Sequence, residues 1–354
     1  MTQIENQAAN RDVEVLKLDP EALSRLGPLI ESLGDACGVI AIQMAELRKA
    51  LEVTRLKSLR NATTGVYARA MLRQIFGDFI AHEPGTRLGE DPEELHQMRV
   101  ASRRLRATID LFEAALAPEF AYLKDELRWV GRVLGNVRDL QVQRESLLDL
   151  LIGFELPASN PLIEKLAQDT REAQAEVASA LDSARYRNLV QRMTAALATE
   201  DVVSGESQSP IQPYAAQAVR DRYKTVRKRA SRLRIDSPDA ELHKTRIKIK
   251  RLRYAAETFQ PVFGKRLKPL RDESKSLQDL LGEHQDHVAA RAWMGEIAAR
   301  EARSLPSETL VQIGALVERR RHEMILIRLL WPEAYSRLGK RWRRVKKHLK
   351  PASG

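Results

Sequence analysis

Apolar residues recur every three or four positions along most of the chain after residue 60, and this spacing predicts amphipathic helices. No stretch alternates apolar and polar positions in the way that is typical of a half-buried strand. We therefore expect an all-α protein. In the first half the pattern predicts helices at 61–81, 92–116, 119–149 (bent or interrupted near Gly135), 161–180 and a shorter one reaching 197.

The clearest amphipathic segment occurs twice, at 94–112 and again 147 positions later at 241–259. Eight of the nineteen aligned positions are identical, and the same register continues on both sides of the segment. A constant offset of this kind predicts duplicated helices joined by loops of nearly equal length. We expect two four-helix bundles related by a pseudo-two-fold axis, which would bring the two copies of the segment toward one another.

Each copy has an apolar arc that would face a core and an adjoining arc that is basic. Like charges three or four positions apart repel one another on a helix, so two such stripes favour a site for an anion over a solvated helix face. Lys244, Lys248 and Arg251 lie off the basic arc, and we expect them to be solvated or peripheral. The predicted site residues are His96, Arg99, Arg103 and Arg106 in the first copy, and His243, Arg246, Lys250 and Arg253 in the second.

The string from Leu95 to Arg106 resembles the signature of the conserved-histidine α-helical domain (CHAD) family. The resemblance extends to 134–139 and 281–286 and covers roughly residues 60–350. It implies two four-helix bundles around a basic pore that binds inorganic polyphosphate, and it places Arg138 at that site. It further implies a location at polyphosphate granules, with granule-associated proteins as partners.

Two aspartates accompany these motifs. Asp139 follows Arg138, and Asp286 stands at the matching position of the second half. A carboxylate does not bind phosphate directly, so we expect both aspartates to orient the neighbouring basic side chains.

Residues 201–212 have the composition of a linker, being polar, rich in serine and ended by proline. This linker would separate a first bundle at 61–200 from a second at 213–350. Residues 1–60 would form a helical N-terminal extension, for which the sequence suggests no function.

The formal net charge of +11 is unevenly distributed. It amounts to −1 for residues 1–60, −6 for 61–210 and +18 for 211–354, so we expect the second half to contribute more of the affinity for a polyanion. Aromatic residues make up only 5% of the chain, which favours a polyanion without bases over single-stranded nucleic acid. A basic helical protein that binds nucleic acid stays the alternative, because duplex binding needs only phosphate contacts. Other polyanions also stay open as ligands.

Signatures of enzymes do not occur in the sequence, which lacks a Walker-type phosphate loop, a Gly-x-Ser-x-Gly elbow and a His-Glu-x-x-His motif. We expect a non-catalytic protein without cofactor or metal, although an accessory role in polyphosphate or phosphate metabolism stays open. His284 and His287 could together hold a metal, but no further ligand completes the set. We assign them, with Arg227, as additional contacts to polyphosphate.

Cys37 is the only cysteine, so no disulfide can form within the chain, and a reducing compartment is expected. The N-terminus lacks the pattern of a signal peptide, and no apolar run approaches the length of a membrane span. The sequence thus predicts a cytoplasmic protein without membrane contact.

Overall fold

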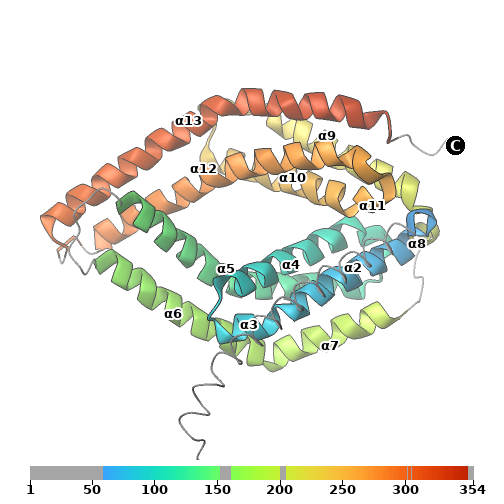
Figure 1. Ribbon diagram of the computed structural model, residues 1–354, viewed down its shortest axis with the longest axis horizontal. Coiled ribbons are helices and arrows are strands. Elements are labelled where there is room, and N and C mark those ends of the chain that lie inside the picture. Colours follow the sequence, from blue (N-terminus) through green and yellow to red (C-terminus); the bar gives the residue numbers. More distant parts are fainter. Residues whose placement is uncertain (1–58, 152–160, 200–204, 301, 304, 350–354) are drawn as a thin grey trace, which may run out of the picture. The chain divides into compact units, whose positions relative to one another are not determined.

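The computed structural model describes residues 59–151, 161–199, 205–300, 302–303 and 305–349. Within these ranges the chain is helical and contains no β-strand, which confirms the all-α prediction (Figure 1). The predicted extension at 1–60 falls almost wholly outside the described residues. None of the described helices combines the length and the apolar character that a bilayer span requires.

The helices fall into two series along the chain, joined by short 3-10 turns at Leu59–Asn61 (η1), Glu113–Ala115 (η2) and Gly264–Leu267 (η3). The first series contains α2 (Thr64–Ala81), α3 (Glu83–Leu88), α4 (Pro92–Leu111), α5 (Glu119–Leu151), α6 (Pro161–Asp182) and α7 (Ala184–Ala198). The second contains α8 (Gly205–Gln208), α9 (Ile211–Ala230), α10 (Asp239–Thr258), α11 (Gln260–Phe263), α12 (Lys268–Arg300) and α13 (Ser307–Lys346).

Helix α4 carries the first basic stripe and begins where the sequence predicts. The carboxylate of Asp91 accepts a hydrogen bond from the backbone N–H of Glu93 at 2.8 Å, and Pro92 occupies the first turn. The prediction that this helix reaches residue 116 is wrong, because it ends at Leu111 and η2 follows. Helix α5 is continuous, so the interruption expected near Gly135 does not occur.

The helix positions follow the offset of 147 seen in the sequence. Helices α2 and α9 begin at Thr64 and Ile211, and α4 and α10 begin at Pro92 and Asp239. Helices α4 and α10 also have the same length of 20 residues. The matching helix bounds support the inference of a duplicated unit. That inference rests on the constant offset between the two halves.

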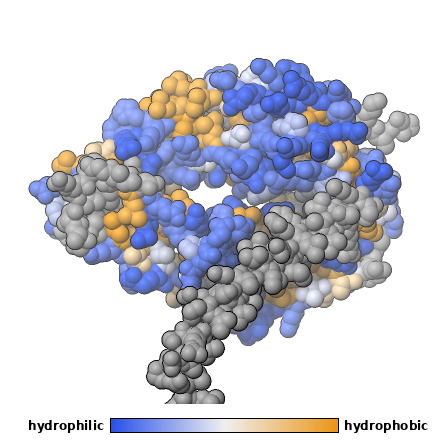
Figure 2. All heavy atoms as spheres, in the orientation of Figure 1, coloured by the Kyte–Doolittle hydropathy of each residue, from blue (hydrophilic) through white to orange (hydrophobic). Residues whose placement is uncertain are grey.

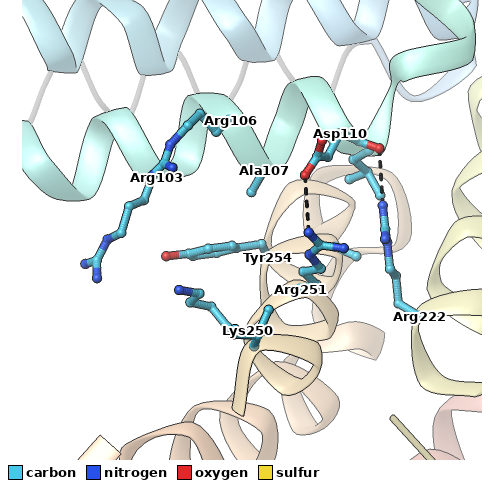
Figure 3. A pocket seen from close by; sticks show the side chains of 11 residues that line it. Arg103, Arg106, Ala107, Asp110, Arg222, Lys250, Arg251 and Tyr254 are labelled. Atoms are coloured by element: carbon cyan, nitrogen blue, oxygen red, sulfur yellow. Dashed lines mark hydrogen bonds and ion pairs between the residues drawn. The ribbon is translucent and has the colours of Figure 1, made fainter. Parts of the chain in front are cut away.

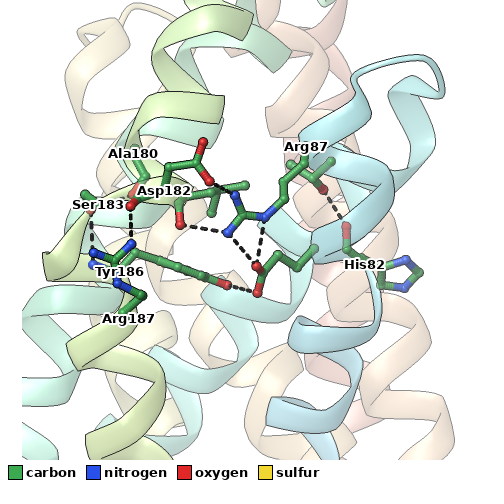
Figure 4. Close-up of polar contacts among 10 residues, drawn as sticks. His82, Arg87, Ala180, Asp182, Ser183, Tyr186 and Arg187 are labelled. Carbon is green, nitrogen blue, oxygen red and sulfur yellow. Dashed lines mark hydrogen bonds and ion pairs between the residues drawn. The ribbon is translucent and has the colours of Figure 1, made fainter. Parts of the chain in front are cut away.

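The halves differ at their last helix. In the first half, Ser183 separates α6 from α7, and its hydroxyl accepts a hydrogen bond from the N–H of Tyr186 at 3.1 Å (Figure 4). The hydroxyl of Tyr186 donates to Glu83 of α3 at 2.7 Å, and Arg87 donates to the carbonyl of Leu181 at 2.8 Å. In the second half, α13 runs through the corresponding position without a break.

Two tyrosines fasten the C-terminal ends of α4 and α10 to opposite halves. The hydroxyl of Tyr67 on α2 donates to the carbonyl of Thr258 at 2.7 Å, and that of Tyr214 on α9 donates to the carbonyl of Leu111 at 2.7 Å. The last carbonyl groups of an α-helix have no partner within the helix. Each half therefore satisfies a helix end of the other.

One hydrophobic core extends through both series of helices. At its centre the buried rings of Phe112 and Phe259 pack edge to face, with centroids 5.5 Å apart. Part of the predicted linker is also structured, since it contains α8, and the N–H of Thr64 donates to the carbonyl of Ser209 at 2.8 Å. The described residues belong to one compact unit, and the division into bundles at 61–200 and 213–350 stays a prediction.

Candidate anion-binding site

Helices α4 and α10 pack against each other near their C-terminal ends, where Phe112 and Phe259 meet. In Figure 2 an opening passes between the two halves, in the region that Figure 1 shows between α4 and α5 on one side and α10 and α12 on the other. Most of the residues around this opening are hydrophilic. The two basic stripes therefore belong to helices that border a common space.

The charges of the two stripes interact directly. Burial lowers the pKa of Lys250 on α10 to about 7, and the cations Arg103, Arg246, Arg106 and Arg99 add to the shift. Three of these four cations belong to α4. In Figure 3 the side chains of Arg103 and Lys250 extend from opposite helices into the same space. The structure thus places the two stripes beside a common space, in the arrangement expected from the repeat.

Arginines of both stripes lie against glycines on the neighbouring long helices. A methyl group added to Gly282 of α12 would lie 3.3 Å from Nη2 of Arg246, and one added to Gly131 of α5 would lie 3.2 Å from Nη2 of Arg106. At Gly135 the corresponding distance, to Nε of Arg99, is 3.6 Å. Glycine weakens a helix interior, and here the missing side chain leaves room for a guanidinium group.

Several donors of the stripes have no acceptor within the described part of the chain. They are Nδ1 of His96 and the Nε atoms of Arg103, Arg106 and Arg246, all of them buried. A buried donor without an acceptor is costly, and an anion placed between the stripes would satisfy it. These atoms are therefore suited to contact a ligand.

Other predicted site residues already have partners in the protein. Nε of Arg253 donates to Glu257 at 2.8 Å, and its Nη1 donates to Gln278 at 3.2 Å. Arg138 donates to Gln141 and to Glu145, each at 3.4 Å. Both arginines would have to share or exchange these acceptors to bind an anion.

The aspartate after Arg138 forms an ion pair with a cation of the first stripe. Nη2 of Arg99 donates to Asp139 at 3.2 Å, so this carboxylate orients a cation of the stripe. Burial raises the pKa of Asp286, and Asp139 acts in the same direction across the two halves, while Arg246 opposes the rise. The two aspartates are therefore near neighbours of the same site.

The two signature histidines differ in their surroundings. Nδ1 of His243 lies 3.0 Å from the side-chain oxygen of Gln285 and is hydrogen-bonded to it. His96 lies near Arg138, which stands where the second half has Gln285. Burial lowers the pKa of His96; Glu93 opposes this, whereas Arg138 and Arg103 lower it further. A neutral imidazole can still donate one N–H to an anion.

The additional contacts assigned from sequence are not brought to this space. His284 accepts from Nε of Arg328 at 3.1 Å, and Nδ1 of His287 is hydrogen-bonded to Arg320 at 3.0 Å. Both histidines are buried against α13, and no group of three metal-ligating side chains occurs among the described residues. Arg227 is exposed on α9, where its charge acts on tyrosines of α9 and α13.

Sequence reasoning missed a cavity of about 190 Å³ between α4, α9 and α10. Arg103, Arg106 and Lys250 line it together with Arg222 and Arg251. Arg251 was expected to be solvated or peripheral; its side chain is 41% exposed, but it also lines this cavity. Arg251 lies off the stripe, on the side of α10 that packs against α9. The proximity of Arg222 and Arg251 depends on this packing and could not be deduced from the sequence.

Comparison with known proteins identifies the family of this chain. The family model of the CHAD domain matches residues 70–295, which include both basic helices. The chain belongs to the CHAD domain family. This CHAD protein is similar to the crystal structure of the CHAD domain from the plant Ricinus communis, with a TM-score of 0.60 and 28% identity over 79% of this chain and 92% of that one.

Two further similarities define the extent of the match. PptA from Streptomyces chartreusis shares the fold, with a TM-score of 0.62 at 20% identity over 78% of this chain and 100% of that one. Uncharacterized proteins from two strains of Mycobacterium tuberculosis are 33% identical over 217 residues, which is 56% of this CHAD chain. The match covers 39% of the length of these curated relatives.

Proposed function

We propose that this CHAD protein binds inorganic polyphosphate, without catalysis, between α4 and α10. The observation that carries the proposal is the convergence of Arg99 and Arg103 with Arg246 and Lys250 from the other half. Cations held this close repel one another unless an anion lies between them. Burial and these like charges lower the pKa of Lys250 to about 7, which expresses the same repulsion in the ligand-free protein.

A linear phosphate chain fits the arrangement of the donors. The stripe on α4 extends over about three helical turns from His96 to Arg106, so its donors follow one another along an axis. Arginine holds phosphate oxygens with two parallel hydrogen bonds and stays charged at any biological pH. Repeating anionic units of a polymer would therefore meet one cation after another.

Binding without hydrolysis is supported by the way the acids are engaged. Metal-assisted attack on a phosphoanhydride needs carboxylates that are free to hold a divalent cation. Asp139 instead pairs with Arg99, and Asp110 receives a hydrogen bond from Lys124 at 2.9 Å. Incubation of the protein with polyphosphate and magnesium or manganese should release no phosphate above the uncatalysed background.

The decisive experiment compares polyanions of equal charge. Long-chain polyphosphate, duplex DNA and single-stranded RNA are titrated against the protein at one fixed salt concentration. We expect the tightest binding for polyphosphate, with an affinity that falls steeply as salt is raised. Equal or tighter binding of either nucleic acid would replace this proposal with a nucleic-acid-binding function.

Localisation to polyphosphate granules, alongside granule-associated proteins, follows from the proposed binding. A fluorescent fusion should collect at granules in cells that store polyphosphate. The variant with Arg99→Ala and Arg103→Ala should stay dispersed, whereas Arg227→Ala, an exposed position away from the two stripes, should behave like the unaltered protein. Granule recruitment of the double variant would show that another surface directs the protein.

A further inference from the structure

The cavity between α4, α9 and α10 is a side pocket of the space between the stripes (Figure 3). Arg103 and Lys250 belong to the two stripes and also line the cavity. In Figure 3 the hydroxyl of Tyr254 points toward these two side chains, while Arg251 and Arg222 lie on the other side of the Tyr254 ring, beside Asp110. The pocket therefore continues the cationic surface away from the opening.

A single acid, Asp110, lies among the cations on the far side of Tyr254. The carboxylate of Asp110 lies 3.8 Å from Nη2 of Arg251, and its backbone carbonyl accepts from Nη2 of Arg222 at 3.2 Å. Burial, followed by the charge of Arg251, lowers the pKa of Arg222. Five cations and one carboxylate thus line the pocket, which leaves a large excess of positive charge.

The inner end of the pocket is closed by the core. Leu111 and Ala255 form part of its lining and are buried. Beyond them the rings of Phe112 and Phe259 are in contact, and the hydroxyl of Tyr214 donates a hydrogen bond to the carbonyl of Leu111. A phosphate chain that enters from the opening cannot continue between α4 and α10 past this point.

The duplicated half has no equivalent pocket lining. The position 147 residues before Arg222 is Ile75, which is buried in the core, and the position before Tyr254 is Ala107. In the second half Arg253 is bound to Glu257, whereas the matching Arg106 has a buried Nε without an acceptor among the described residues. The residues at the matching positions of the first half would not form the same lining, so the repeat alone does not account for the pocket.

We propose that this pocket binds the terminal phosphate group of a linear polyphosphate, with Arg222 and Arg106 as its specific contacts. The inference rests on the proposed function and adds that the site distinguishes a chain end from a chain interior. A terminal phosphate carries three non-bridging oxygens and a second ionisation near neutral pH, as a phosphomonoester does. An interior unit offers two such oxygens and one charge. A pocket that has an excess of arginines and is closed at its inner end by the core therefore favours the end.

The test uses ligands with and without ends. Linear tripolyphosphate, cyclic trimetaphosphate and long-chain polyphosphate are each titrated against the unaltered protein and against Arg222→Ile, which installs the residue of the first half. Lys224→Ile is the matched control, because Lys224 is an exposed cation of the same helix and lies outside the pocket. Linear and cyclic ligands differ in total charge, so the measured quantity is the factor by which each variant weakens each ligand.

We expect Arg222→Ile to weaken tripolyphosphate about tenfold and trimetaphosphate less than about twofold. Long-chain polyphosphate, whose units are mostly interior, should lose less than about threefold. Arg222→Gln, which keeps a polar side chain of similar length, should give the same pattern if both variants keep the helical circular dichroism of the parent.

Other outcomes would overturn the inference. Equal losses for the linear and the cyclic ligand would show that Arg222 adds only general positive charge. Competition by orthophosphate as strong as that by tripolyphosphate would assign the pocket to free phosphate instead of a chain end. If the unaltered protein bound no long-chain polyphosphate, the proposed function itself would fail, and that result is distinct from the first two.

Discussion

Helices α4 and α10 carry the same basic pattern at the same register, yet they hold their cations differently. On α4 the Nε atoms of Arg103 and Arg106 are buried without an acceptor among the described residues. On α10 Arg253 is tied to Glu257 and Gln278, and Lys250 has a pKa of about 7. The first half therefore presents more cations that are both charged and available.

This difference runs against the net charges, which are −6 for residues 61–210 and +18 for 211–354. Much of the positive charge of the second half lies on exposed positions outside the site, such as Arg227, Arg343 and Arg344. Exposed charges attract a polyanion from a distance but form weak individual contacts. The half with the larger net positive charge therefore need not be the half that contributes more to the affinity for the ligand.

The largest expected effect separates the two helices directly. Arg99→Ala with Arg103→Ala should weaken polyphosphate binding about 100-fold, since each contact to a charged group contributes roughly a factor of ten. Arg246→Ala with Lys250→Ala should weaken it about tenfold, because Lys250 is only partly charged near neutral pH. Calorimetric titration measures both, and a larger loss for the second pair would restore the order that net charge predicts.

The next effect concerns the pH dependence of Lys250. An anion stabilises the protonated amine, so affinity should fall as pH rises through its pKa of about 7, by up to about 30-fold between pH 6 and 8.5. Arg99, Arg103, Arg106 and Arg246, which surround this amine, stay charged throughout. Lys250→Arg should bind with little change over the same range. A wild-type affinity that is constant with pH would contradict the assignment.

The same group affects stability in the ligand-free protein. Above pH 7 the folded protein has released the proton of Lys250, whereas the unfolded chain keeps it up to the ordinary pKa of lysine. The unfolded state then binds more protons, so the free energy of unfolding should rise with pH across this window. Chemical denaturation at pH 7 and pH 9 should show a smaller rise for Lys250→Met than for the parent.

A smaller effect distinguishes the paired arginine from its unpaired counterpart. Arg106→Met should weaken polyphosphate binding about tenfold, whereas Arg253→Met should weaken it less than about threefold because Arg253 is bound to Glu257. The two positions are 147 residues apart in the repeat, so each variant serves as the control of the other. Equal losses in a titration at fixed salt would show that the ion pair opens when the ligand binds.

The smallest expected effect concerns the glycines behind the stripes. Gly282→Ala places a methyl group 3.3 Å from Nη2 of Arg246, so this side chain must shift, and affinity should fall about twofold. Gly135→Ala leaves 3.6 Å to Nε of Arg99 and should bind like the parent. Both alanines favour the helix over glycine, so neither variant should be less stable than the parent. A larger binding loss for Gly135→Ala would reverse this comparison.

The sequence predicted the stripes well because a helix converts spacing into direction. Arg99 and Arg103 share an arc by their spacing alone, and the offset of 147 pairs them with Arg246 and Lys250. The structure brings these four into one electrostatic neighbourhood. The same reasoning fixed the start of α4 through its capping residue, but not its end, where the change from α-helix to 3-10 turn depends on packing.

Pairing between side chains could not be deduced in the same way. Arg106 and Asp110 have the i, i+4 spacing of Arg253 and Glu257, and spacing predicts an ion pair in both cases. Only the second pair forms with good geometry, because Asp110 is instead engaged by Lys124. The competing partner comes from another helix, so only the tertiary structure can identify it.

The exchanged tyrosine hydrogen bonds between α2 and α10 and between α9 and α4 have a consequence for folding. If either half came apart, a carbonyl acceptor at the end of the other half's signature helix, at Thr258 or at Leu111, would lose its tyrosine donor. Loss of one half thus removes the conditions under which the other is stable. The two repeats should therefore melt together in a single cooperative transition.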